Sequence, residues 1–207
     1  MQTQTTNPSG NKAHIVFDVR KLVFTALLAA ISSVLMLFSI KVPLMPSFIS
    51  FDFSDFPAVM ASLTMGPIAG VFVCLVKNII NLFSSMTGGV GELSNFILGA
   101  VFTGTAGLIY KKNKTKKGAI IGAIVGSVIM GIISFPSNLF IVYPAYEKFT
   151  PINEIMDAYS KLLPSVGKLW QALLIFNVPF TIVKGLISTL ITVLIYKRLS
   201  PVLKGRG

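Results

Sequence analysis

Charged residues are scarce in this sequence. Only 12% of its 207 residues are charged and only seven are acidic, whereas 53% are hydrophobic. A soluble domain usually carries about twice that charged fraction, and so few polar side chains cannot cover a surface exposed to water. With a mean hydropathy of +0.78, the composition excludes an ordinary soluble fold. It predicts one all-α integral membrane domain.

The sequence also has only one cysteine and one histidine. Cys74 lies in an apolar run, so it excludes an intramolecular disulfide and is interpreted as a small packing residue. No metal site is expected. The sequence contains no GxxxxGK[ST] phosphate loop and no HExxH motif, so the chain is not expected to hydrolyse ATP or act as a metalloenzyme. No pair of carboxylates lies within a predicted span, which argues against a proton relay.

What the sequence does have is a series of apolar segments, of which six are predicted to be membrane helices. They cover about residues 20–41, 54–65, 68–85, 93–110, 118–142 and 169–196. The second is short, about 18 Å if fully helical. The first is too long for the apolar core of a signal peptide, which is usually about 7 to 15 residues.

The domain organisation follows from these segments. Residues 19–200 are expected to form one transmembrane domain, preceded by a disordered or interfacial tail (1–18) and followed by a cytoplasmic tail (201–207). Glycines 88, 89 and 91 place a loop at residues 86–92. An amphipathic surface helix is expected within the polar connection 143–168.

Basic residues decide the orientation, because 18 Lys and Arg give a net charge of +11. Three clusters fall on one side of the predicted bundle: residues 20–21, 111–117 and 197–206. The acids Asp52, Asp55 and Glu92 fall on the other side. The positive-inside rule therefore predicts both termini in the cytoplasm of a multi-pass cell-membrane protein. Short basic clusters between apolar runs favour lipid contact, so nucleic acid is not expected as a partner.

Polar side chains inside the spans mark a candidate binding site. Lys77 and Lys184 lie in the middle of predicted helices, where an unpaired lysine is costly. Lys77 can alternatively reach the cytoplasmic side. Asparagines also interrupt the apolar spans, more of them than ties between helices usually need: Asn78, Asn81, Asn95, Asn138 and Asn177.

Two of these asparagines place the site in the outer half of the membrane. Asn177 lies two helical turns before Lys184, about 10 Å along one face, and precedes Pro179, which frees a backbone carbonyl. Asn138 follows Pro136, and Tyr143 closes the same predicted helix. We therefore expect a small-molecule site that opens to the outside.

The apolar loop 43–53 lies at that outer end. It carries Met45, Phe48, Phe51, Phe53 and Asp52. These side chains would either cap the pocket or form an aromatic belt at the membrane interface.

Small residues suggest where helices pack closely. Ala26 and Ala30 lie on one face of the first predicted helix, at a spacing that lets another helix approach. Glycines 118, 122 and 126 are expected to pack the fifth helix against its neighbours.

Several segments resemble the substrate-binding S components of energy-coupling factor (ECF) vitamin transporters, in particular the riboflavin-specific ones. They are TALLAAISSVLM (25–36), FDFSDFPAVMASLTMGPIAGVFVCLVKNIINL (51–82), GGVGELSNFILG (88–99) and FNVPFTIVKG (176–185). The resemblance covers nearly the whole chain after residue 18. It implies a six-helix S-component fold, a non-enzymatic role in binding riboflavin from outside, and no cofactor besides this transported ligand.

The resemblance also implies partners and site residues. The partners are a transmembrane coupling subunit, contacted through Ala26 and Ala30, and two ATPases. The loop 43–53 corresponds to a lid. The expected ligand contacts are Met45, Phe48, Asp52, Asn81, Asn95, Asn138, Tyr143, Asn177 and Lys184.

Two alternatives stay open from the sequence. One is an S component for another vitamin, such as thiamine, folate or biotin. The other is a membrane enzyme that uses a serine with Lys184 as its base.

Overall fold

The computed structural model describes residues 19–85 and 87–204. The predicted amino-terminal tail, residues 1–18, lies outside the described residues. The long helices are α1 (Val19–Leu37), α2 (Asp55–Met65), α3 (Pro67–Asn81), α4 (Val90–Lys112), α5 (Lys116–Ser137), α7 (Ile152–Leu162) and α9 (Val178–Lys204). The short elements are β1 (Ile40–Lys41), β2 (Ser50–Phe51), η1 (Leu82–Ser84), η2 (Asn138–Val142), α6 (Tyr143–Tyr146), α8 (Leu169–Ala172) and η3 (Leu173–Asn177).

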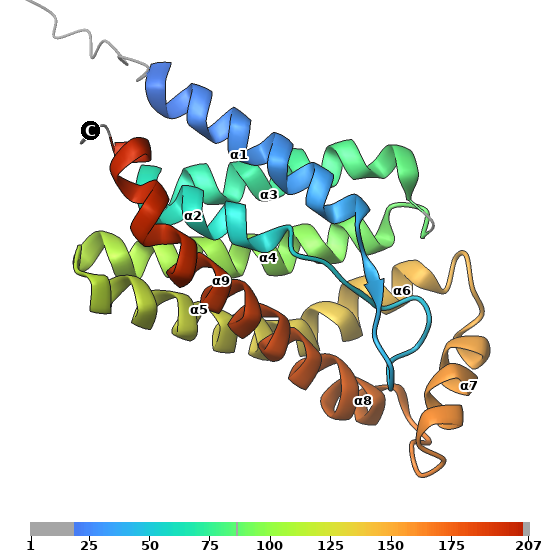
Figure 1. Ribbon diagram of the computed structural model, residues 1–207. Coiled ribbons are helices and arrows are strands. Elements are labelled where there is room, and N and C mark those ends of the chain that lie inside the picture. The colour runs from blue at the N-terminus through green and yellow to red at the C-terminus, as the bar shows by residue number, and fades with distance from the viewer. Residues whose placement is uncertain (1–18, 86, 205–207) are drawn as a thin grey trace, which may run out of the picture.

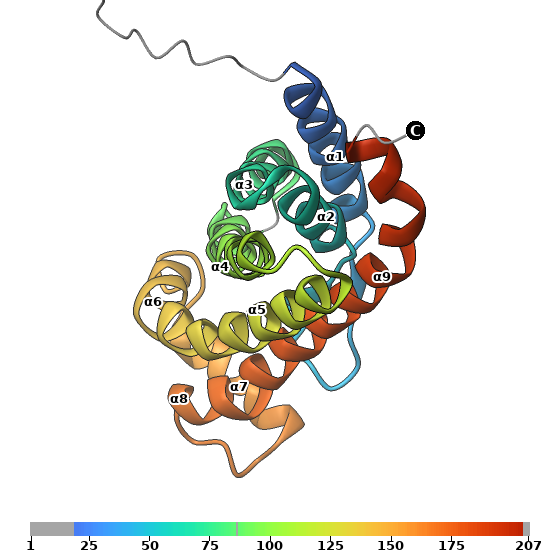
Figure 2. The ribbon, with the colours of Figure 1, turned by 90° about the vertical axis from the view of Figure 1, so that its left-hand side faces the viewer.

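Five helical segments of the described chain are long and apolar enough to cross a membrane. They are Val19–Leu37, Pro67–Ser84, Val90–Lys112, Lys116–Tyr146 and Leu169–Tyr196. The remaining bundle helix, α2, has 11 residues, most of them buried. It contacts α1, α3, α4 and α9, and Figure 2 shows it inside the bundle beside α1 and α3. The chain is thus an all-α integral membrane protein.

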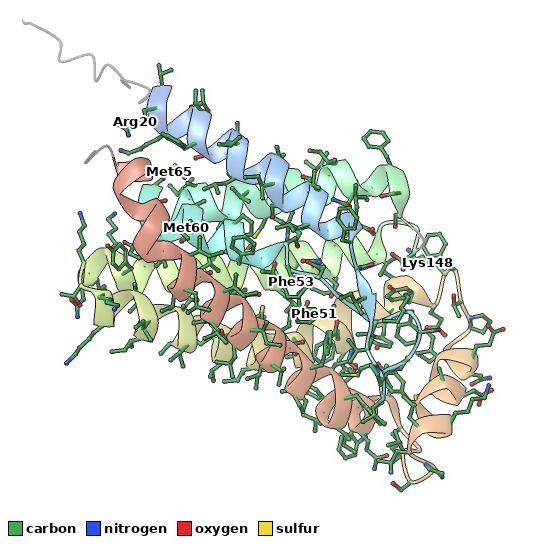
Figure 3. The ribbon with its side chains drawn as sticks, in the orientation of Figure 1. Arg20, Phe51, Phe53, Met60, Met65 and Lys148 are labelled. Carbon is green, nitrogen blue, oxygen red and sulfur yellow. The ribbon has the colours of Figure 1, made fainter. Side chains whose placement is uncertain are left out.

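The two ends of the described chain lie together. The start of α1 and the end of α9 are neighbours in both ribbon views (Figures 1 and 2). The end of α4 lies at the same place, because the hydroxyl of Tyr110 on α4 is 2.9 Å from that of Tyr196 on α9. Arg20 and Met65 lie at this end, and Lys148 lies at the opposite end with the hairpin and α7 (Figure 3). We call these the terminal end and the hairpin end.

The first predicted helix ends earlier than expected. Instead of continuing to residue 41, α1 stops at Leu37, and Ile40–Lys41 pairs with Ser50–Phe51 as an antiparallel hairpin. Pro43 and Pro46 lie in the connection, where they cannot continue a helix. Leu44 adopts a positive φ of 67° there, which is unusual for a non-glycine residue. The loop 43–53 is therefore largely a structured hairpin.

The glycine-rich segment 86–92 is only partly a loop. Gly88 and Gly89 have positive φ angles of 61° and 88°, a conformation that glycine adopts without strain. The helix α4 then begins at Val90, three residues earlier than predicted.

Small residues pack α5 against α4, as the sequence predicts. A Cβ at Gly122 would lie 2.8 Å from the carbonyl oxygen of Ala106, and one at Gly126 would lie 2.8 Å from that of Phe102. Only glycine allows the two backbones this separation.

The two last predicted spans are interrupted near the hairpin end. Wider π-helical turns, Asn138–Val142 and Leu173–Asn177, replace the regular α-helix. Each lies beside a proline, Pro144 or Pro179, whose ring nitrogen cannot donate to the preceding turn. Such turns are frequent at functional sites because they redirect side chains. The sequence does not predict these turns.

The helix expected within residues 143–168 is present as α7. It is amphipathic, but it is not only a surface element, because Ile155 and Tyr159 are buried. These side chains belong to a core cluster with Tyr143 and Leu173. At the other boundary, α9 continues as a helix to Lys204, so residues 201–204 are helical.

Candidate binding site

A cavity of about 570 Å³ lies at the hairpin end of the bundle. This volume is within the range of about 300 to 1,000 Å³ that holds drug-sized ligands. Its polar and charged lining residues are Ser39, Lys41, Ser47, Ser50, Asp52, Asp55, Asn81, Ser84, Thr87, Glu92, Ser94, Asn95, Asn138, Tyr143, Tyr146, Asn177, Thr181 and Lys184. Its apolar lining residues are Met36, Leu37, Phe48, Ile49, Leu98, Met130, Val142 and Phe180.

Lys184 lies in this cavity and is paired. Its Nζ donates to Asp52 Oδ2 at 2.9 Å and lies 3.4 Å from Asp55 Oδ2. Only 12% of its side chain is exposed. Asp52 comes from the segment after β2 and Asp55 from the start of α2, so the ion pairs join the hairpin region to α9. These two acids were expected near the outer surface, but both are buried.

The second intramembrane lysine, Lys77, lies behind the cavity wall and is fully buried. Its Nζ donates to Ser54 Oγ and to Asp55 Oδ1, each at 2.6 Å. The alternative that Lys77 reaches the cytoplasmic side is therefore wrong. Two lysines and two aspartates offset one another here, which reduces the cost of burying each charge. Asp55 lies at the start of α2 and Asp52 in the segment after β2, so the two carboxylates meet without sharing a span.

The electrostatics of Asp52 follow from this pairing. Burial alone would raise the pKa of its carboxyl, but the charges of Lys184 and Lys77 and the hydrogen bond from Ser54 outweigh that effect. They hold the pKa of Asp52 well below its usual range. Asp52 is thus a carboxylate at physiological pH and keeps Lys184 in place.

Asn177 belongs to a closed triangle of hydrogen bonds. The Tyr159 hydroxyl donates to Asn177 Oδ1 at 2.6 Å, and Asn177 Nδ2 donates to Tyr143 Oη at 3.1 Å. The Tyr143 and Tyr159 hydroxyls are also hydrogen-bonded to each other. The network uses one of the two amide hydrogens of Asn177 and fixes the orientation of its amide group at the cavity wall.

The other asparagines of the lining keep more capacity for a ligand. Asn95 has no hydrogen-bond partner among the described residues, and Asn138 has only a long contact of 3.4 Å from Ser94 Oγ. Asn81 donates both amide hydrogens to backbone carbonyls, those of Ser33 and Lys77. Its Oδ1 remains available as an acceptor. A buried amide group without a hydrogen-bond partner costs free energy, so these asparagines favour a polar ligand that supplies the missing hydrogen bonds.

Phe48 places the hairpin over the cavity. Its ring lies 6.5 Å from that of Tyr143, 6.1 Å from that of Tyr146 and 6.0 Å from that of Tyr159. Lys41 Nζ donates to the carbonyl oxygen of Ser47 at 2.5 Å across the hairpin. This arrangement corresponds to a cap on the pocket.

The structure gathers most of the predicted site residues. All of them line the cavity except Met45, which lies outside the lining. Sequence reasoning missed Asp55, Glu92 and Thr181, which also line it. Asp55 has a helix-start pattern, Ser-Asp-Phe-Pro, that by itself indicates a capped helix. In the sequence, only the presence of Lys77 and Lys184 within apolar spans indicated that each lysine needs a buried acid as its partner.

A cavity with many polar lining residues lies among membrane-spanning helices, at the end opposite the start of α1 and the end of α9. This arrangement defines a membrane protein that binds a small solute. The family model described as ECF transporter, substrate-specific component, matches residues 20–196. The chain belongs to this family. Its members are components of transporters and not enzymes.

Individual relatives agree with the family. The chain is 34% identical to the riboflavin transporter RibU of Staphylococcus aureus (strain TCH60), over 89% of this chain and 93% of the relative. It is 33% identical to the riboflavin transporter FmnP of Bacillus subtilis (strain 168), over 88% and 93%. A solved structure described as the S component of a bacterial ECF transporter has a TM-score of 0.71 and 32% identity, covering 90% of this chain and 98% of that one.

Proposed function

We propose that this chain binds riboflavin in the cavity at the hairpin end and delivers it for uptake. The observation that carries the proposal is the cavity of about 570 Å³ in a chain about one third identical, over nearly its whole length, to relatives named riboflavin transporters. The ligand contacts proposed are Phe48, Asp52, Asn81, Asn95, Asn138, Tyr143, Asn177 and Lys184.

The lining suits the chemistry of a flavin. Riboflavin combines a flat heteroaromatic ring, with carbonyl groups and an imide N–H, and a chain of hydroxyls. Phe48, Leu98 and Phe180 provide apolar and aromatic surface for the ring. The amides of Asn95 and Asn138 offer donors and acceptors to its polar edge or to the hydroxyls. A few convergent polar groups on an apolar wall are typical of small-molecule sites.

We infer six membrane crossings with both termini in the cytoplasm. The helix α2, with 11 residues, would be the sixth and shortest crossing. An even number of crossings agrees with the terminal ends of α1 and α9 lying together (Figure 1). The lysines between 111 and 117 lie at the end of α4, in the connection and at the start of α5, at this same end of the bundle. The positive-inside rule assigns that end to the cytoplasm. The cavity then faces outward.

Uptake requires partners. The family implies a transmembrane coupling subunit and two ATPases, since the sequence has no ATP-binding loop of its own. Ala26 and Ala30 are both exposed on the outer face of α1. They offer a flat surface on which a helix of the coupling subunit can pack closely.

Equilibrium titration of the purified chain with riboflavin in detergent tests the proposal. Bound flavin should lose fluorescence, and the substitution Lys184→Met should weaken binding at least about a hundredfold, because it leaves the buried carboxylate of Asp52 without its lysine partner. Lys148→Met is the matched control, since Lys148 is exposed; its affinity should equal that of the wild type.

Competition measurements separate the alternatives. Thiamine, folate and biotin should not displace the flavin. The proposal fails if the folded wild-type chain does not quench flavin fluorescence, or if one of these vitamins binds in place of riboflavin. A serine-reactive probe that labels the chain only when Lys184 is present would instead support the membrane-enzyme alternative.

A further inference from the structure

Lys77 completes a closed ring of polar side chains at the base of the cavity. Lys77 contacts Asp55, Asp55 contacts Lys184, and Lys184 contacts Asp52. Asp52 accepts from the backbone N–H of Ser54 at 2.8 Å and from its hydroxyl. The Ser54 hydroxyl accepts in turn from Lys77 Nζ at 2.6 Å. We call these five side chains the charge ring.

The charge ring joins parts of the chain that are remote in sequence. Lys184 on α9 is 132 residues from Asp52, and Lys77 lies on α3. Ser32 of α1 also donates to the backbone carbonyl of Ser54. Asp52, Asp55 and Lys184 line the cavity, whereas Lys77 and Ser54 do not. Lys77 therefore cannot act on a ligand directly.

The distances show how the charges are shared. Lys77 Nζ lies 2.6 Å from Asp55 Oδ1. Lys184 Nζ lies 2.9 Å from Asp52 but 3.4 Å from Asp55. Because Lys77 neutralises Asp55, Lys184 can make its closer contact with Asp52, which immediately follows β2. In a poorly solvated interior such charge interactions are strong enough to choose between arrangements.

We infer that Lys77 is a positioning residue, which holds Lys184 on Asp52 and thereby keeps the hairpin and the cavity base in the ligand-binding arrangement. This inference rests on the proposed function. Without Lys77, the buried carboxylate of Asp55 would lose its closer partner and draw Lys184 away from Asp52. The hairpin would then lose its connection to α9.

A charge-compensation experiment tests the inference. Lys77→Met should reduce riboflavin affinity about tenfold or more, because one carboxylate in the ring loses its partner. Adding Asp55→Asn removes that excess negative charge and leaves the Lys184–Asp52 pair intact. The double variant Lys77→Met/Asp55→Asn should therefore bind riboflavin more tightly than Lys77→Met, although it lacks one more side-chain charge.

The pH dependence gives a second signature. In Lys77→Met, Asp52 and Asp55 share one lysine, so one of them should take up a proton more readily. Its affinity should rise as the pH falls from 8 to 5, whereas that of the wild type should stay flat. The other titratable groups of this region are the buried Cys74 thiol on α3, and Lys41 and Glu92 in the cavity lining. They are common to both proteins and cancel in the comparison.

Failure of the inference about Lys77 can be distinguished from failure of the proposed function. If the wild type does not bind flavin, the proposed function fails. If the wild type binds and Lys77→Met binds equally well, the inference is overturned. If Lys77→Met does not fold, the double variant decides: recovery of folding and affinity supports charge positioning, and weak binding by a folded double variant overturns it.

Discussion

Tyr159 lies outside the cavity, yet its hydroxyl orients an amide inside it. Burial raises the pKa of Tyr159 well above its ordinary value, so the hydroxyl stays protonated and donates to Asn177 Oδ1. With that oxygen accepting from Tyr159, Asn177 donates from Nδ2 to Tyr143 Oη, and its side chain lines the cavity. The orientation of the amide is therefore set by a residue of α7.

The substitution Tyr159→Phe should test this dependence. It removes one hydroxyl and keeps the ring against Phe48, so riboflavin affinity should fall about two- to tenfold, the value of one hydrogen bond. Titration by flavin fluorescence measures it. Tyr110→Phe is the control, because it removes a comparable tyrosine pair at the terminal end. Equal affinities for both variants and the wild type would contradict the role of Tyr159.

Single residues were predictable from the sequence where their chemistry conflicts with an apolar surrounding. Lys184, Asn138 and Asn177 are conspicuous because charge and amides are costly in hydrocarbon. Their partners were not predictable. Asp52 is far from Lys184 along the chain, and Tyr159 looked like part of a surface helix. A sequence shows which groups need partners, but only packing shows which partners they have.

The hairpin is the element that depends most directly on an ionised group. Asp52 follows β2 and pairs with Lys184, and its pKa is held below the ordinary value of about 4 by the lysines. A depressed pKa contributes stability that is complete above the unfolded value and is lost as the pH falls through the folded one. The hairpin attachment should thus be constant from pH 5 to 8.

Thermal unfolding of the wild type and Asp52→Asn measures this contribution. The wild type should melt at a higher temperature by a constant difference between pH 5 and 8, because the variant loses the carboxylate paired with Lys184. The difference should shrink below pH 4 as Asp52 protonates. Asp157→Asn serves as the control, since Asp157 is exposed on α7. A difference that already shrinks between pH 8 and 6 would contradict the low pKa.

At the scale of helices, the sequence predicted where the apolar segments lie but not how their ends are shaped. Hydrophobic length located α1, α3, α4 and α5 to within about five residues, and it located the last span as the helical run Leu169–Tyr196. The π turns at 138–142 and 173–177 were missed because their residues are as apolar as regular helix. The hairpin was missed because two-residue strands carry no periodic pattern.

At the scale of the whole molecule, two opposite ends have separate tasks under the proposed function. The hairpin end holds the cavity, and the terminal end gathers the ends of α1, α4 and α9 (Figures 1 and 3). The exposed stripe of α1 with Ala26 and Ala30 belongs to neither core nor cavity. Binding and coupling should therefore be separable by substitution.

The substitution Ala30→Trp should separate them. A bulky ring on the exposed face of α1 would keep a coupling helix from approaching closely, while the cavity, lined by α1 only at Met36 and Leu37, stays unchanged. Riboflavin affinity in detergent should equal that of the wild type. Uptake of labelled riboflavin by cells that also produce the coupling subunit and both ATPases should fall about tenfold or more, as a loss of about 1.4 kcal/mol in association predicts.

Val128→Trp is the control for this substitution. It places the same ring on the exposed face of α5, where Val128 is 40% exposed, and should leave uptake intact. Equal uptake by the two variants would show that α1 is not the coupling surface, whereas a loss of affinity in Ala30→Trp would show that the two ends are not independent.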